Sequence, residues 1–125
     1  MQGLPRLNVG AFFMPPIWGP AHGFWITILY YPAWLVADNL FYATYLDPSV
    51  VNVAMAVSVA LVLLGVTVAF AIVSQPIAAH RAEDAGVSRE AYLKRQRIWA
   101  VVSIALAVVA VALATFYNLN IRTEV

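Results

Sequence analysis

The chain has 125 residues, of which 63% are hydrophobic and 10% are charged, and its formal net charge is +1. This composition is too apolar for a water-soluble domain of the same length and predicts an integral membrane protein. So small a charge argues against nucleic acid as a partner. The absence of cysteine excludes disulfides, thiolate metal sites and a cysteine nucleophile.

Residues 1–19 combine aromatic rings with residues that bend the chain. Pro15, Pro16 and Gly19 argue against one continuous helix through this stretch. Aromatic side chains beside such bends are typical of the lipid headgroup zone, where a ring can lie half in water. We therefore expect an interfacial or re-entrant segment. The candidates for contact with lipid or a partner are three aromatic residues of this segment and one that follows it: Phe12, Phe13, Trp18 and Trp25.

A kinked helix is expected over residues 20–46. Proline is tolerated in a first helical turn, so Pro20 is a suitable start, and Pro32 would then kink the helix. Asp47 precedes a proline and is therefore biased out of the helical conformation. Residues 24–36 are almost all apolar or aromatic, which favours a membrane span. The alternative is a helix that lies in the interface, which would leave a hairpin of two spans.

Two longer apolar runs follow. Residues 50–73 contain no charged side chain, and residues 98–117 are apolar except for Ser103 and Thr115. About 20 apolar residues cross about 30 Å of hydrocarbon, so each run predicts a transmembrane helix. We therefore expect an all-α membrane protein with a single domain, three spans in preference to two, and a short tail at residues 118–125.

The connection over residues 74–97 is expected to be a helical hairpin tip. It carries five of the seven Lys and Arg residues, so the positive-inside rule places it in the cytoplasm. Gly86 suits the position just after a helix, Ser88 suits the N-cap of the next one, and Pro76 is expected to kink the first arm. The basic side chains that are candidates for contact with a partner or with anionic lipid are Arg89, Lys94 and Arg95.

Small residues recur at spacing four along both long spans. Such faces let helix backbones approach closely in lipid. Because the connection between the two spans is short, we expect these two helices to pack against each other. The pairs are Ala54 and Ser58, Ala56 and Ala60, Gly65 and Ala69, Ser103 and Ala107, and Ala110 and Ala114.

Three polar residues in the N-terminal third form a candidate polar membrane site: His22, Asp38 and Asn39. Asp38 is the only ionisable group within the expected first span, and a carboxylate in a membrane is a functional hypothesis by default. Its distance from Asp47, about 13 Å along a helix, places it near the membrane boundary beside Asn39. A lone histidine such as His22 is expected to bond a nearby backbone carbonyl. No residues stand at metal-ligand spacing, and we expect neither a metal nor a cofactor.

The segment Asn8-Val-Gly-Ala-Phe-Phe-Met-Pro-Pro-Ile-Trp18 resembles an uncharacterised family of small bacterial membrane proteins. That family has an N-terminal Asn-Trp-x-Ala-Phe-Phe-x-Gly-Pro-x-Trp pattern, followed by a further Trp and hydrophobic spans. Val9 replaces the first Trp and Pro15 replaces the Gly. The resemblance implies a bacterial cytoplasmic-membrane protein with an aromatic entry segment, and it implies no activity. The matching positions are Asn8, Ala11, Phe12, Phe13, Pro16, Trp18 and Trp25.

No catalytic motif or phosphate-binding glycine loop is present, so we expect no enzyme. The leading hypothesis is a small multi-pass protein of the bacterial inner membrane, an accessory or structural subunit that contacts lipid and other membrane subunits or itself. One alternative is a homo-oligomeric transporter or channel. The other is a membrane anchor that recruits a cytoplasmic partner through the basic hairpin. The polar residues that would line a transport path are Asp38, Asn52, Ser58 and Thr67.

Overall fold

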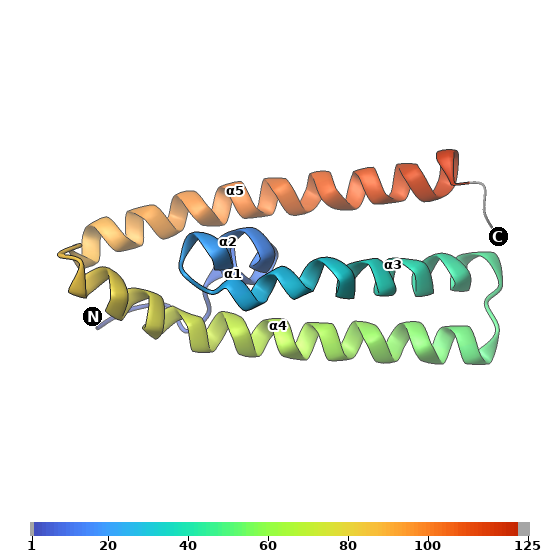
Figure 1. Cartoon of the computed structure of the whole chain (residues 1–125), viewed down its shortest axis with the longest axis horizontal. Coiled ribbons are helices and arrows are strands. Elements are labelled where there is room, and N and C mark those ends of the chain that lie inside the picture. The colour runs from blue at the N-terminus through green and yellow to red at the C-terminus, as the bar shows by residue number, and fades with distance from the viewer. Residues whose placement is uncertain (1, 123–125) are drawn as a thin grey trace.

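The computed structural model describes residues 2–122 (Figure 1). These residues form helices and no strands. Two short helices come first, and three long ones follow. The elements in order are α1 (Val9–Phe13), α2 (Pro15–Ala21), the 3₁₀-helix η1 (Trp25–Leu29), α3 (Tyr30–Leu46), α4 (Val50–Asp84), α5 (Arg89–Phe116) and the π-helix η2 (Tyr117–Ile121). The expected all-α fold is therefore confirmed for the described residues.

Two helical stretches are long and apolar enough to cross a membrane, Val50–Asp84 and Arg89–Ile121. They contain the two spans expected at residues 50–73 and 98–117. Both extend past the expected limits into the connection, because the sequence continues with helix-forming residues on both sides of a tight turn. The expected tail begins within this continuous helical stretch, since η2 carries the chain from Tyr117 to Ile121, and residues 123–125 lie outside the described residues.

The turn between α4 and α5 is the one expected from the sequence. Gly86 has φ +84°, a conformation that glycine adopts without a steric penalty. The Val87 N–H donates to the Ala82 carbonyl at 2.9 Å and the Gly86 N–H donates to Glu83 at 3.0 Å, a Schellman motif. Ser88 Oγ then accepts from the Ala91 N–H at 3.2 Å and caps α5. We call the part of the molecule around this turn the hairpin end.

Pro76 lies inside α4 without ending it, and α4 bends toward α5 as it approaches the hairpin end in Figure 1. Beyond the hairpin end the two long helices separate and make few contacts with each other. The expectation that their small-residue faces pack together is therefore wrong. The reason lies in the N-terminal segment, because α1 packs against both α4 and α5 and holds them apart.

The N-terminal segment is enclosed by the long helices. Ala11, Pro15 and Trp18 are fully or almost fully buried, and Asn8 N–H donates to the carbonyl of Ala71 on α4 at 3.1 Å. Close approach depends on Gly10, where a Cβ atom would lie 2.8 Å from Trp18 Cδ1. Helix α1 therefore lies between the two long helices.

The helix expected to begin near Pro20 begins later. Helix α2 ends at Ala21, Gly23 turns the chain with φ +85°, and only then do η1 and α3 follow. Pro32 lies in the first turn of α3, where its missing N–H removes no helical hydrogen bond, so it need not kink the helix. The end of the helix at Leu46 is as expected, with extended backbone at Asp47.

Helix α3 runs antiparallel to α4, against which it packs (Figure 1). The N-terminal residues return to the hairpin end, where Arg89 donates to the carbonyls of Gln2 at 2.7 Å and Gly3 at 3.1 Å. The α3–α4 turn and η2 lie together at the opposite end, which we call the far end.

Candidate functional site

A network of polar side chains joins the N-terminal segment to both long helices near the hairpin end. Asn8, which is 2% exposed, donates through Nδ2 to Gln75 Oε1 at 2.8 Å and to Gln96 Oε1 at 2.9 Å. Its Oδ1 accepts from the Ala11 N–H at 2.9 Å and thereby caps α1. Tyr92 donates its hydroxyl to the same Gln75 oxygen at 2.8 Å. One asparagine thus ties α1, α4 and α5 together.

Trp18 of α2 and His22, which follows α2, complete this network. Trp18 Nε1 donates to Gln96 Oε1 at 3.0 Å, and the indole stacks on the His22 ring at 4.0 Å between centroids. His22 Nδ1 lies 2.8 Å from the Trp18 carbonyl and its Nε2 lies 3.0 Å from Gln96 Nε2. These contacts fit a neutral imidazole with its proton on Nδ1. Burial lowers the pKa of His22 below its usual value, and the hydrogen bond to Trp18 opposes this shift.

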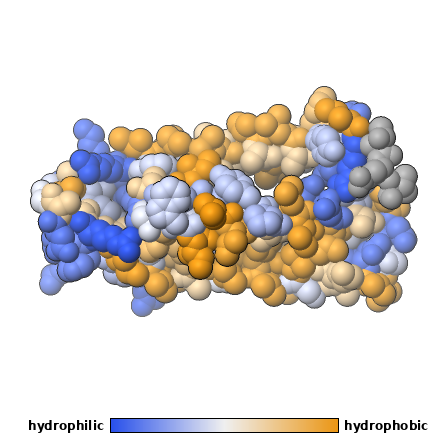
Figure 2. Space-filling view, in the orientation of Figure 1, coloured by the Kyte–Doolittle hydropathy of each residue, from blue (hydrophilic) through white to orange (hydrophobic). Residues whose placement is uncertain are grey.

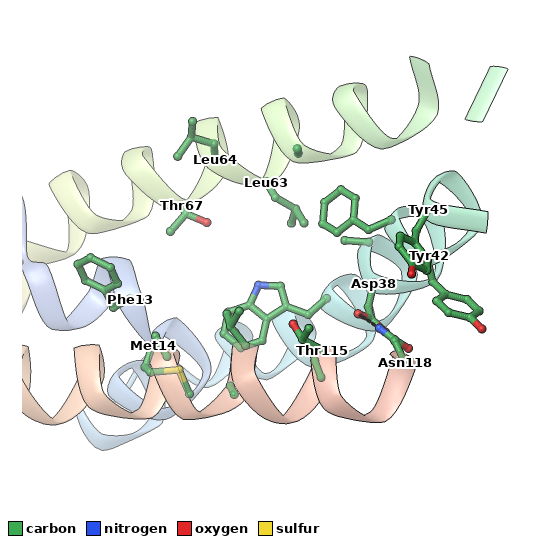
Figure 3. Close-up of a pocket in the computed structure, with 18 of the residues that line it drawn as sticks. Phe13, Met14, Asp38, Tyr42, Tyr45, Leu63, Leu64, Thr67, Thr115 and Asn118 are labelled. Carbon is green, nitrogen blue, oxygen red and sulfur yellow. Dashed lines mark hydrogen bonds between the residues drawn. The ribbon is translucent and has the colours of Figure 1, made fainter. Parts of the chain in front are cut away.

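An apolar groove of about 760 Å³ lies between α3, α4 and the far half of α5. Figure 2 shows apolar residues over most of the length of the molecule, with polar residues at both ends and an opening between α5 and α3. In Figure 3, Leu63 and Leu64 of α4 lie across the groove from Thr115 of α5, and Phe13 and Met14 lie at the side of the groove nearest α1. Ala107, Ala110 and Ala114 form most of the α5 wall, so the wall is shallow and smooth.

A cluster of polar residues lies at the far end of the groove. Asn118 donates to Asp38 Oδ1 at 2.8 Å (Figure 3). Arg122 Nη1 lies 4.0 Å from Asp38 Oδ2. Arg122 also donates to Asn118 at 3.1 Å and to Asn39 Oδ1 at 2.9 Å, and its guanidinium lies 4.2 Å from the centre of the Tyr42 ring. This cluster is the main polar link between α3 and the end of α5.

The candidate polar membrane site is thus divided between the two ends. Asp38 and Asn39 belong to the far-end cluster, as their neighbouring positions on one helix suggest. His22 belongs to the network near the hairpin end and bonds a backbone carbonyl, as expected. Sequence reasoning missed Gln75 and Gln96, which are uncharged polar residues at the borders of the two apolar runs. Asn8 was named only as the first residue of the segment that resembles the small bacterial membrane proteins, and its role in joining the helices was not predicted.

The candidate contact residues also lie in different environments. Phe12 and Phe13 line the groove, and Trp25 is 67% exposed. Trp18 is fully buried, which leaves no surface of its ring for a partner. Arg89 holds the N-terminal residues through two carbonyls, whereas Lys94 and Arg95 are exposed on α5.

Residues 2–122 contain no group of three His, Asp or Glu side chains placed to bind a metal ion. Two serine hydroxyls, on Ser74 and Ser103, are buried without a hydrogen-bond partner within the described part of the chain. No protein family, curated protein or solved structure gives a significant match to this sequence.

Proposed function

We propose that this chain is a non-catalytic accessory subunit of the membrane, whose groove receives an apolar transmembrane helix of a partner subunit. The observation that carries the proposal is the separation of the far half of α5 from α3 and α4. In the most apolar 18-residue stretch of each helix, only 11% is buried within the chain for α4 and 6% for α5. Both helices therefore keep most of their apolar surface for lipid or for another protein.

The groove wall has the composition that helix association in lipid requires. Lipid tails are as apolar as leucine, so close backbone approach and interhelical contacts decide whether helices associate. Ala110 and Ala114 are exposed on α5, and the exposed Ala60 faces them from α4. These small side chains would let a partner helix approach closely between the two.

We further propose that η1 and α3 together form a third span. Trp25–Leu46 contains 22 residues, with a length of about 35 Å that is sufficient to cross the hydrocarbon core. Three crossings agree with the antiparallel α3 and α4 and with the N-terminal residues at the hairpin end. The basic residues of 74–97 would then place the hairpin end and the N-terminus in the cytoplasm. The resemblance to small bacterial membrane proteins supports the inner membrane as the location.

The proposal is tested in native membranes with the double variant Ala110→Leu/Ala114→Leu. Its matched control is Ala112→Leu, since Ala112 is exposed on the same helix but does not line the groove. Crosslinking followed by gentle solubilisation should give a complex of higher mass for the native chain and for the control, and little for the groove variant. A native chain that runs as a monomer without a partner would sink the proposal.

The transport alternative receives no specific support. Thr67 and Asp38 line the groove, but Asn52 donates to the Asp47 carbonyl at 2.9 Å in the α3–α4 turn, and Ser58 is exposed outside the groove. The four residues therefore do not line one common path.

A further inference from the structure

A smaller cavity, of about 360 Å³, lies near the hairpin end between α4, α5 and the end of α2. Among its lining residues, within the part of the chain that the structure describes, the charged ones are Arg81 of α4 and Arg95 of α5, and none is acidic. Asp84 of the α4 arm, which does not line the cavity, lies 3.4 Å from His80 on its own helix. The cavity therefore has a positive lining.

Arg81 is held in place by the turn between α2 and η1. Its Nη1 donates to the His22 carbonyl at 3.0 Å, and its guanidinium lies 4.7 Å from the centre of the Phe24 ring. A guanidinium has five N–H donors, so most of them remain for a ligand after this one bond. The structure thus fixes the position of one cationic group and leaves its donors largely unused.

Arg95 faces the cavity from the other arm. Within residues 2–122 it makes no hydrogen bond or ion pair with another side chain or carbonyl, so its donors can also reach a ligand. The neutral polar groups of the lining are already used, because Gln96 bonds Trp18 and His22, and Tyr92 bonds Gln75. The two guanidinium groups are therefore the polar groups most available to a ligand, beside the apolar wall of Trp99.

We propose that this cavity binds a phosphate group between Arg81 and Arg95. Arginine forms paired, charge-assisted hydrogen bonds with phosphate oxygens, and two arginines on separate helices can bind one phosphate from two sides. This depth rests on the proposed function: with α4 and α5 across the membrane, the cavity lies beyond their most apolar stretches, at the level of lipid headgroups. The phosphate comes from a lipid headgroup or from a soluble phosphate, and both sources share this chemistry. The site is separate from the groove and does not depend on a partner helix.

The test uses the purified full chain in a detergent without phosphate. Short-chain phosphatidylglycerol and inorganic phosphate are titrated separately, and binding is followed by tryptophan fluorescence and by the shift in the unfolding temperature. The decisive variant is Arg95→Gln, which removes no hydrogen bond or ion pair within the described residues. Its matched control is Arg97→Gln, the same charge change on the same arm at an exposed position outside the cavity.

We expect Arg95→Gln to weaken binding at least tenfold and Arg97→Gln to change it less than twofold. Binding of phosphatidylglycerol that inorganic phosphate does not displace would identify a lipid headgroup. Binding of inorganic phosphate alone would identify a soluble ligand, and either result supports the site. The proposal is overturned if neither probe binds, or if both variants weaken binding equally, since that would indicate general attraction to the basic surface.

Discussion

The two ends of this molecule are held together in different ways. Near the hairpin end, α1 packs against both α4 and α5. Asn8 there bonds side chains of both long helices, and Trp18 and His22 bond Gln96 of α5. At the far end, α5 stands apart from α4 and is linked to α3 mainly through Asp38, Asn118 and Arg122. The same apolar helices are therefore fixed at one end and open at the other.

For a chain in the membrane, as proposed above, this difference follows from the physics of packing in lipid. Apolar side chains gain little by leaving lipid for other apolar side chains, so hydrogen bonds and close contacts decide where helices are held. Buried, fully paired amides give such contacts near the hairpin end. The far end offers a partly exposed ion pair, whose contribution to stability is small.

The largest effect is expected for Asn8→Ala. It removes the cap of α1, a buried hydrogen bond to Gln75 and a partly buried one to Gln96, and should lower the free energy of unfolding by about 2–4 kcal/mol. The measurement is denaturant unfolding in mixed micelles. Asn120→Ala is the control, because Asn120 is exposed and bonds only within its own stretch of helix, and it should cost under about 0.5 kcal/mol. Equal losses would show that the network does not hold the hairpin end.

A smaller loss is expected for Gly19→Ala. A Cβ at Gly19 would overlap the Thr27 side chain and push η1 away from α2, at a cost of about 1–3 kcal/mol. Gly65→Ala is the same change in α4, where a Cβ meets nothing within 4 Å, so it should be neutral or slightly stabilising. The two variants are compared by their thermal unfolding midpoints. Destabilisation by Gly65→Ala as large as that by Gly19→Ala would contradict the close packing of α2 on η1.

The stability of the hairpin end should also depend on pH through His22. Its pKa is lowered in the folded chain, so the unfolded chain takes up a proton first as the pH falls. Stability is then complete above the usual histidine pKa of about 6.5 and decreases as the pH falls below it. Arg81, which donates to the His22 carbonyl, stays charged throughout. Unfolding measured from pH 8 to pH 5 should show this decrease, and His22→Gln should remove most of it. An unchanged slope in the variant would assign the effect to another group.

The smallest effect is expected at the far end for Asp38→Asn. An asparagine keeps an acceptor for Asn118 and loses only the charge that faces Arg122 at 4.0 Å. This ion pair is partly exposed, so the loss should be under about 1 kcal/mol. The same unfolding measurement applies. Added salt should reduce the difference in the free energy of unfolding between the native and variant chains. A loss as large as that of Asn8→Ala would mean that the far end is held as firmly as the hairpin end.

The sequence predicts the local features of this fold well. The two spans follow from length and polarity, and the turn follows from Gly86 and Ser88. It does not predict the position of α1 and α2 between the long helices. That position rests on contacts between residues far apart in the chain, such as Asn8 with Gln96, and on the close approach of Trp18 to Gly10. Hydropathy and spacing describe single segments and carry no information about which distant amide pairs with which.

The candidate polar membrane site could be predicted only in part, for the same reason. Asp38 and Asn39 are adjacent, so their common cluster could be expected, although their partners Asn118 and Arg122 could not. His22 lies near the other end, because η1 and the first half of α3 separate it from Asp38 along the length of the molecule.

The most direct test of the contrast between the two ends measures distances between spin labels in lipid nanodiscs. One pair, at Ile77 and Ile98, reports on the hairpin end, and a second pair, at Met55 and Leu113, reports on the far end; all four residues are exposed on α4 or α5. The chain has no native cysteine to interfere with labelling. We expect a narrow distance distribution for the first pair and a longer, broader one for the second. A far-end distribution as narrow and short as that of helices packed at about 8–10 Å would contradict an open groove.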